Sequence, residues 1–310
     1  MVLAGEKILL TGATGTLGAM MARALAPHNE VWGLARYSDP MAADVARQSG
    51  LVPVRMDLQA PDFSSLPTDF TYLLHFAHTR RGPDEFLESV QINAVGPGLL
   101  MQHCRDVKAA LIVSSTAVYS PPVDVWHLLG ERDPTGGAFA PWAPSSPVSK
   151  VSLEATARLA AEAFGIRTLI ARLNATYGPG RGMKGGGMPV ADLEAVVEGQ
   201  PIRTFADPYP HSPIHFADMV DQLEALLDAA SVPATIVNWC GDEVITQRQW
   251  CELAGSFSGR SPELIVHPIA GVSSGNAGDP TRRRALTGPC KHGFAESYRA
   301  IYDALVAQPG

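Results

Sequence analysis

The feature that most constrains the fold of this chain is a glycine-rich segment close to its N-terminus. An apolar run at residues 8–11 is followed by Gly12, Gly15 and Gly18 at three-residue spacing, and then by a helical pattern at residues 19–25. In such a strand–turn–helix unit the first glycine permits a tight turn, the second lets the backbone approach a pyrophosphate, and the third lets the helix pack closely on the sheet. The N–H groups at the start of the helix then point at the anion. The segment therefore predicts a dinucleotide-binding site.

The first half of the chain continues as an alternation of short apolar runs and helical patterns. This alternation predicts an α/β fold of the Rossmann type, in which a doubly wound parallel sheet has helices on both faces. The runs are apolar throughout, as expected for strands whose two faces are both covered. We expect strands at residues 8–11, 30–34, 72–75, 110–114 and 168–171, and helices at residues 19–25, 86–104 and 153–164.

A change in amino-acid composition after Tyr177 predicts a domain boundary. Residues 178–187 are rich in glycine, which predicts a mobile loop without regular structure. We expect a dinucleotide-binding domain at residues 1–176, which also receives parts of residues 210–245, and a smaller C-terminal α/β substrate lobe at residues 177–310. Within the second part of the chain, helices are expected near residues 190–198, 217–228 and 295–306, and a strand at residues 235–239.

Charge, hydropathy and cysteine spacing argue against several classes of protein. The 24 Lys and Arg and 31 Asp and Glu give a net charge of −7, without the basic stripe that nucleic acids or anionic membranes require. The N-terminus lacks a signal-peptide pattern, and no run approaches the ~18 apolar residues of a membrane span. We expect a cytoplasmic protein with a small-molecule substrate, no nucleic-acid or membrane partner and no metal. Its separated cysteines are interpreted as reduced packing residues: Cys104, Cys240, Cys251 and Cys290.

The end of the second expected strand bears on the choice of cofactor. NAD-binding proteins usually carry Asp or Glu there, to hydrogen-bond the ribose 2′-hydroxyl. This strand instead ends in Ala35 and Arg36, followed by Tyr37. A guanidinium can hold the 2′-phosphate of NADP through charge-assisted hydrogen bonds, and the phenol ring can cover the adenine. The sequence thus favours NADP, with NAD as the alternative if Arg36 is only a solvated charge.

Further segments resemble, in the same order, those of the extended short-chain dehydrogenases/reductases, a family that includes sugar-nucleotide epimerases and dehydratases. The likeness extends over nearly the whole chain and is carried by residues 11–18, 56–58, 75–77, 93–96, 114–119, 172–180, 214–218 and 238–243. The resemblance implies a catalytic hydroxyl at Ser115 and a homodimer formed through the helices near residues 86–104 and 153–164. It also implies cofactor contacts from Gly12, Thr14, Gly15, Thr16, Leu17, Gly18, Asp57, Leu58, Phe76, Ala77, Asn93 and Lys150.

The chain departs from this family at its proton-transfer pair, a Tyr four residues before a Lys. Lys150 stands at the position of the Lys, but residue 146 is Ser, and no Tyr-x-x-x-Lys occurs anywhere in the sequence. Since an alkyl hydroxyl is a far weaker acid than a phenol, whose pKa is about 10, Ser146 cannot simply take over. The alternative proton sources are Tyr119, His127, Tyr209 or a water held by Ser146, and each of these side chains also has an ordinary structural interpretation.

Two further departures concern the substrate. Family members that bind sugar-nucleotide diphosphates usually carry Asn where this chain has Ala175, and Arg near the place of residues 211–213. Other basic residues can bind the diphosphate instead, or can be ordinary surface charges: Arg181, Lys184 and Arg203. Near the expected cofactor, His75 is interpreted as a structural side chain that ends a buried strand, whereas His78, Arg80 and Arg81 are left without a firm assignment.

The favoured hypothesis is an NADP-dependent oxidoreductase or epimerase that acts on a hydroxyl or carbonyl group. Ser115 would hydrogen-bond the substrate oxygen, and Lys150 would hold the nicotinamide ribose. Ser146 and Tyr119 complete the candidate catalytic set. Two alternatives stay open. One is a lyase-like enzyme that keeps its cofactor bound, and the other is a non-catalytic dinucleotide-binding sensor or scaffold, for which the missing Tyr is the main argument.

Overall fold

The computed structural model describes residues 3–141 and 143–307, which divide into two compact units. The first unit contains the residues up to Val118, Ala140–Arg172 and Val220–Val237, and the second contains Tyr119–Phe139, Leu173–Met219 and the residues from Asn238 onward. Each unit therefore collects segments that are distant in the sequence. The glycine-rich segment at residues 12–18 and Lys150 belong to the first unit.

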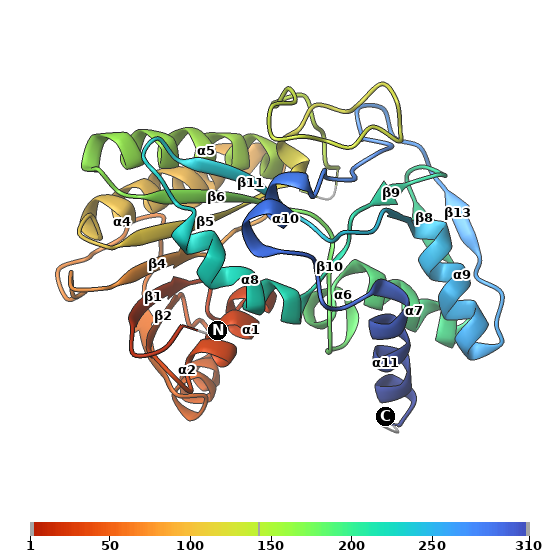
Figure 1. Ribbon diagram of the computed structural model, residues 1–310, viewed down its shortest axis with the longest axis horizontal. Helices are drawn as coiled ribbons and strands as arrows, with labels where there is room; N and C mark the ends of the chain where they lie inside the picture. Colours follow the sequence, from red (N-terminus) through yellow and green to blue (C-terminus); the bar gives the residue numbers. More distant parts are fainter. Residues whose placement is uncertain (1–2, 142, 308–310) are drawn as a thin grey trace. The chain divides into compact units, whose positions relative to one another are not determined.

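A seven-stranded sheet forms the framework of the first unit (Figure 1). The neighbouring strands from β3 through β2, β1 and β4 to β5 pair in parallel. This sheet, with helices beside it, confirms the predicted Rossmann-type α/β fold. In spatial order its strands are β11 (Thr235–Trp239), β6 (Thr168–Leu173), β5 (Ala109–Ser115), β4 (Tyr72–His75), β1 (Lys7–Thr11), β2 (Glu30–Ala35) and β3 (Leu51–Arg55).

The order of the strands reverses beside β1. Leu9 of β1 lies opposite Trp32 of β2 on one side and opposite Leu73 of β4 on the other. The chain therefore leaves the carboxyl ends of β1 and β4 in opposite directions. In open α/β sheets a crevice forms at this reversal, and ligands bind there.

Helices cover this sheet with an apolar core between the layers. Leu9, Leu73 and Ile112 share one buried cluster with Leu100 of α4 and Leu153 of α5. Successive strand residues point to opposite faces, so the neighbours of Leu9 point away from α4 and α5. The helical segments of this unit are α1 (Thr16–Leu25), α2 (Pro40–Gln48), α3 (Phe86–Val90), the π-helical η2 (Gln91–Val95), α4 (Gly96–His103), α5 (Ser145–Phe164) and most of α8 (Phe216–Asp228), with short 3-10 turns η1 (Pro83–Glu85) and η3 (Thr116–Val118).

The second unit combines short strands with helices around an aromatic core. Trp250, Phe294 and Tyr298 are buried there beside Val190 and Leu193. Within the glycine-rich segment, where a loop without regular structure was expected, the structure has a single helical turn, α6. The elements are β7 (Thr176–Tyr177), α6 (Gly182–Gly185), α7 (Met188–Glu198), β8 (Ile202–Thr204), β9 (Pro210–His211), β10 (Ile214–His215), β12 (Ile245–Thr246), α9 (Gln247–Ser258), β13 (Leu264–Val266), α10 (Thr281–Thr287) and α11 (Phe294–Ala307).

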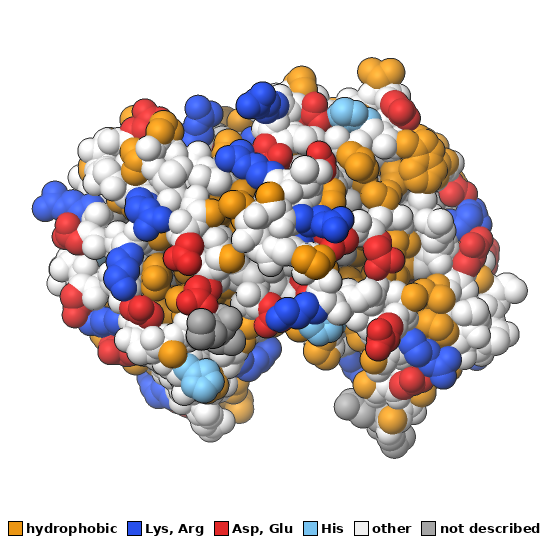
Figure 2. All heavy atoms as spheres, viewed as in Figure 1, with side chains coloured by type: hydrophobic (Ala, Val, Ile, Leu, Met, Phe, Trp, Pro, Cys, Tyr) orange, Lys and Arg blue, Asp and Glu red, His pale blue; other side chains and the backbone are white. Residues whose placement is uncertain are grey.

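The surface carries charges of both signs. On the face drawn in Figure 2, Lys and Arg side chains alternate with Asp and Glu, and no area of that face is covered by basic side chains alone. Among the described helices, none has the length and apolar character needed to cross a membrane.

Candidate active site

The glycine-rich turn after β1 is shaped by close backbone contacts. Gly12 has a φ of +76°, and a Cβ added there would lie 2.9 Å from the amide nitrogen of Ala77. A Cβ on Gly18 would lie 2.2 Å from the carbonyl oxygen of Gly12, so neither position accepts a side chain. Gly15 is the N-cap of α1, and the first turn of that helix holds no acidic residue. Backbone N–H groups at this helix start therefore suit a pyrophosphate, and the site fits a dinucleotide.

The end of β2 lies beside this turn, because the N–H of Gly12 donates to the carbonyl oxygen of Leu34, and β3 pairs with β2. Arg36 is exposed, as an interaction with a cofactor phosphate would require. Tyr37, which was expected to cover the adenine, is not exposed. Its side chain is buried, and its hydroxyl donates a hydrogen bond of 2.8 Å to the carbonyl oxygen of Gly33. Burial raises the pKa of this phenol. Farther along, Asp57 is exposed and accepts a hydrogen bond from the backbone N–H of Gln59.

A buried histidine links the ends of β1 and β4. The Nδ1 atom of His75 lies 2.8 Å from the hydroxyl of Thr11, which also accepts a hydrogen bond from the backbone N–H of Ala77. Burial lowers the pKa of His75 to about 3, and the charge of Lys150 acts in the same direction. His75 is therefore neutral, and its Nε2 atom has no hydrogen-bond partner in the described part of the chain.

Asn93 fastens the loop that follows β4. Its side-chain amide donates to the carbonyl oxygen of Thr79 at 2.9 Å and to Ser149 at 3.1 Å, and its side-chain oxygen accepts from the N–H of Thr79 at 2.8 Å. Asn93 lies in the π-helical segment η2, a local irregularity that often marks functional sites. The residue expected to contact the cofactor thus connects the β4 loop with α5.

Lys150 is buried on the first turns of α5. Its Nζ donates a hydrogen bond of 2.6 Å to the carbonyl oxygen of Val113 on β5. Burial lowers the pKa of Lys150 to about 8, Glu154 opposes this effect, and the charge of Arg80 adds to it. Ser115 ends β5 two residues after Val113, and its hydroxyl accepts a hydrogen bond from the N–H of Ala117. The structure therefore brings Lys150 and the end of β5 together.

Ser146 forms a pair that the sequence did not predict. Its hydroxyl lies 2.7 Å from Nε2 of His78. Burial and the charges of Lys150 and Arg80 hold the pKa of His78 well below 6.5. Ser146 precedes Lys150 by four residues, so both lie on one face of α5. No local pattern joins two residues that are 68 positions apart. Ser in place of Tyr at position 146 is the sequence signal that indicates a different proton partner there.

A buried ion pair lies deeper in this unit. Two guanidinium nitrogens of Arg172 donate to the two carboxylate oxygens of Glu154 at 2.7 and 2.9 Å, and the hydroxyl of Ser114 donates to the same carboxylate at 2.6 Å. Glu154 and Arg172 are 7% and 4% exposed. The network joins α5 to β5 and β6 directly beneath Lys150 and Ser115.

Comparisons with known proteins assign this arrangement to a family. Residues 8–239 match the model of the NAD dependent epimerase/dehydratase family. The chain belongs to this family. The resemblance inferred from the sequence motifs is thereby confirmed at the level of the family.

Similar solved structures extend over nearly the full chain. A UDP-glucuronic acid 4-epimerase from Bacillus cereus, in complex with UDP-glucuronic acid and NAD, is 20% identical, with a TM-score of 0.79 and coverage of 97% of this chain and 99% of that one. A UDP-N-acetylglucosamine 4-epimerase from Methanobrevibacter ruminantium, in complex with UDP-N-acetylmuramic acid, is 18% identical, with a TM-score of 0.81 and coverage of 99% and 100%. A UDP-glucose 4-epimerase from Thermus thermophilus, in complex with NAD, is 21% identical, with a TM-score of 0.75 and coverage of 96% and 97%. Curated proteins yield no match.

The other proton sources considered from the sequence belong to the second unit. The Tyr119 hydroxyl donates to the Oδ1 atom of Asn238 at 2.6 Å. His127 is paired with Asp133 at 2.7 Å near the surface. Tyr209 is buried, and burial raises the pKa of its phenol to about 12. Tyr119 and His127 therefore have polar partners within that unit, and Tyr209 is buried in it.

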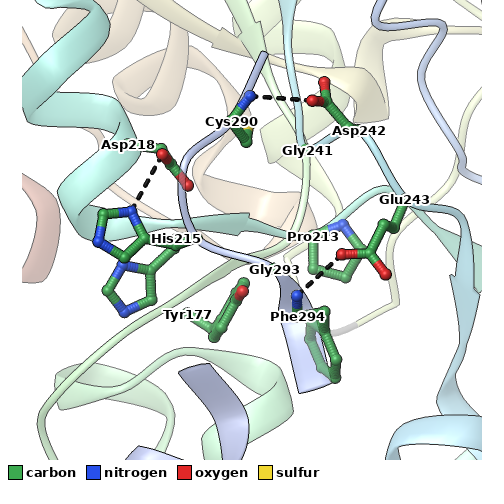
Figure 3. Close-up of a pocket in the computed structure, with 11 residues that line it drawn as sticks. Tyr177, Pro213, His215, Asp218, Gly241, Asp242, Glu243, Cys290, Gly293 and Phe294 are labelled. Carbon is green, nitrogen blue, oxygen red and sulfur yellow. Dashed lines mark hydrogen bonds and ion pairs between the residues drawn. The ribbon is translucent and has the colours of Figure 1, made fainter. Parts of the chain in front are cut away.

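A separate polar pocket of about 100 Å³ lies within the second unit (Figure 3). Asp218 lines it, and its Oδ1 accepts hydrogen bonds from the N–H of Lys291 and from Nδ1 of His292. His215 stacks on His292 with ring centroids 4.8 Å apart, and burial lowers the pKa of His215 to about 4. Among the described residues no cluster of three or more His, Cys, Asp or Glu suits a metal ion.

Proposed function

We propose that this family member is an NAD(P)-dependent oxidoreductase or epimerase that acts on a hydroxyl or carbonyl group of a small molecule. The observation that carries the proposal is that one unit contains both the turn after β1, where Gly12 and Gly18 leave no room for a side chain, and the positions of Lys150 and Ser146 on α5. When bound, a nicotinamide dinucleotide supplies the acceptor and donor of hydrogen with its electron pair. The 4-epimerases of similar fold support a redox-neutral use of that chemistry.

The chain's own residues would divide the work as follows. The first turn of α1 and the backbone around Gly15 would bind the pyrophosphate. Lys150, held by the carbonyl oxygen of Val113, keeps further N–H donors for the hydroxyls of the nicotinamide ribose. Ser115 would donate a hydrogen bond to the substrate oxygen and so favour the developing negative charge on it.

A cofactor titration tests this assignment. Wild-type protein is expected to bind NADP(H) more tightly than NAD(H), because Arg36 stands exposed where an acid would favour NAD. Arg36→Ala should weaken NADP(H) binding about 10- to 100-fold and leave NAD(H) unchanged, since a charge-assisted hydrogen bond contributes ~1.5–3 kcal/mol. Lys150→Ala should weaken both cofactors by a similar factor. Arg158→Ala, an exposed site on α5, is the matched control.

Each outcome of that titration has a definite meaning. Equal wild-type affinities for the two cofactors would contradict the NADP preference. An unchanged dissociation constant in Lys150→Ala would mean that this side chain does not face the cofactor. A protein that binds neither dinucleotide would overturn the proposed function, whereas tight binding without turnover of any hydroxyl or carbonyl compound would favour a sensor or scaffold.

We also propose that the protein forms a homodimer through α3, α4 and α5. Large apolar side chains are exposed on these helices: Phe86 at 60%, Leu87 at 70%, Leu99 at 41%, Val148 at 55% and Leu159 at 69%. Exposed apolar side chains gathered on adjacent helices are typical of an interface. Light scattering should give the mass of two chains, and Leu159→Glu should give one. Val306→Glu on α11 should stay dimeric, and a monomeric wild type at micromolar concentration would contradict the proposal.

A further inference from the structure

We propose that His78 and Ser146 together form the proton-transfer unit of this site, in the place where the family carries a Tyr. Ser146 would touch the substrate oxygen, and His78 would act behind it by taking and returning the hydroxyl proton. This inference rests on the proposed function, because it assigns the proton that accompanies the redox step. It names a histidine that neither the family match nor the similar structures assign.

The pair is held in place by contacts on both sides. His78 belongs to the loop after β4, and Asn93 binds both backbone groups of Thr79 in that loop. Ser145, at the start of α5, donates a hydrogen bond of 3.0 Å to the carbonyl oxygen of Arg81. The loop is thus fastened to η2 through Thr79 and to α5 through Arg81, within three residues of His78 and its 2.7 Å contact with Ser146. These contacts hold the His78 and Ser146 side chains at a fixed distance, which proton transfer between them requires.

The chemistry explains why a serine requires this neighbour. A free alkyl hydroxyl neither releases its proton nor accepts a second one readily near neutral pH, and an adjacent imidazole is the usual group that activates it. The charged groups that face His78 are Lys150 on α5 and Arg80 in its own loop, with neutral His75 on β4 nearby. Because burial and these positive charges disfavour the imidazolium, His78 rests neutral and offers a lone pair.

The proposed step balances without any further reactant. In the oxidation direction, the O–H bond of the substrate alcohol breaks and its proton passes to Oγ of Ser146, while the Oγ proton passes to Nε2 of His78. A bound oxidised dinucleotide would accept the hydrogen of the substrate carbon with its electron pair, which would leave a carbonyl group. In the return direction, His78 gives its proton back through Ser146. Because burial and the positive charge of Lys150 disfavour protonated His78, the imidazolium readily gives up its proton, which Ser146 passes to the substrate oxygen.

Nitrogen NMR of the histidines tests the pair in full-length protein without substrate. With ¹⁵N-labelled histidine, His78 is expected to be neutral at pH 7.5, with Nε2 unprotonated and accepting from Ser146. His78→Gln assigns the signal, and Ser146→Ala should shift it. Ser152→Ala, whose hydroxyl bonds the carbonyl of Val148 on the same helix, should leave it unchanged. A protonated Nε2 in the neutral ring, or a signal that ignores Ser146→Ala, would overturn the inference.

Turnover separates this inference from the proposed function. His78→Phe and Ser146→Ala should each lower kcat by at least about 100-fold, while the dissociation constant for the dinucleotide and the thermal unfolding curve stay unchanged. The double variant should be no slower than either single variant, because the two side chains act as a unit. Wild-type turnover in either single variant would sink the pairing and leave the proposed function standing. A wild-type protein that binds no dinucleotide would instead contradict the proposed function.

Discussion

Glu154→Leu is expected to lower the free energy of unfolding by about 3–5 kcal/mol, because it removes the carboxylate that pairs with the buried guanidinium of Arg172. Both side chains are almost fully buried, and the carboxylate accepts two hydrogen bonds from Arg172 and one from Ser114. An uncompensated buried charge is among the few causes of so large a loss from one substitution. Urea denaturation at pH 7.5 measures the effect.

The double variant Glu154→Leu, Arg172→Met is the control. It removes both charges and fills a similar volume with apolar groups, so it should recover most of the stability lost in the single variant. Ser114→Ala should cost less, about 1.5–3 kcal/mol, the usual range for a hydrogen bond to a charged group. A loss below about 1 kcal/mol in Glu154→Leu would show that water or another group reaches Arg172.

The expected loss bears on the active site as well as on stability. Glu154 follows Lys150 by one helical turn, and Ser114 precedes Ser115 on β5. The ion pair therefore fixes the two elements that carry these candidate site residues. A site built from separate elements depends on such supporting contacts for its distances.

Local patterns predicted the fold well because the physical reasons for them are local. The turn after β1 needs glycine at positions 12 and 18 to avoid backbone clashes, and this spacing is a local pattern of the sequence. Strand β3 was not predicted, since Pro53 interrupts its apolar pattern. The structure places β3 at the edge of the sheet, where a strand tolerates a missing backbone donor.

The candidate site was predictable only in part. Lys150 and Ser115 were found through their motifs, and the structure joins their two elements through the carbonyl of Val113. The contact of His78 with Ser146 depends on how a loop after β4 folds against the start of α5, which no periodicity encodes. Tertiary contacts of this kind appear only when the chain is folded.

Acidification is expected to destabilise the protein strongly, because it contains buried neutral histidines. Burial lowers the pKa of His75 and of His211 to about 3, and both side chains are at most 3% exposed. Their unfolded pKa is about 6.5. Below that pH the unfolded chain binds protons that the folded chain cannot, so the stabilisation is complete above pH 6.5 and is lost as the pH falls toward 3.

Other groups change the size of this effect but not its direction. His215, with a pKa of about 4, and His78, whose pKa burial holds well below 6.5, add to it. Asp192 opposes it, because burial raises its pKa to about 6 and the folded state then binds a proton more readily than the unfolded state. At about 1.4 kcal/mol per pH unit for each group, the net loss of unfolding free energy between pH 7.5 and pH 5.5 is about 3–5 kcal/mol.

Urea midpoints measured at pH 7.5 and pH 5.5 test this expectation. The His211 ring is surrounded by Tyr209 and Trp250, and neither of its nitrogens has a hydrogen-bond partner in the described part of the chain. His211→Phe keeps an aromatic ring there and should reduce the loss on acidification by about 1.4 kcal/mol. His28→Gln, an exposed site, should leave the loss unchanged. A wild-type stability that is equal at the two pH values would mean that water reaches His75 and His211, and that these side chains titrate as they do in the unfolded chain.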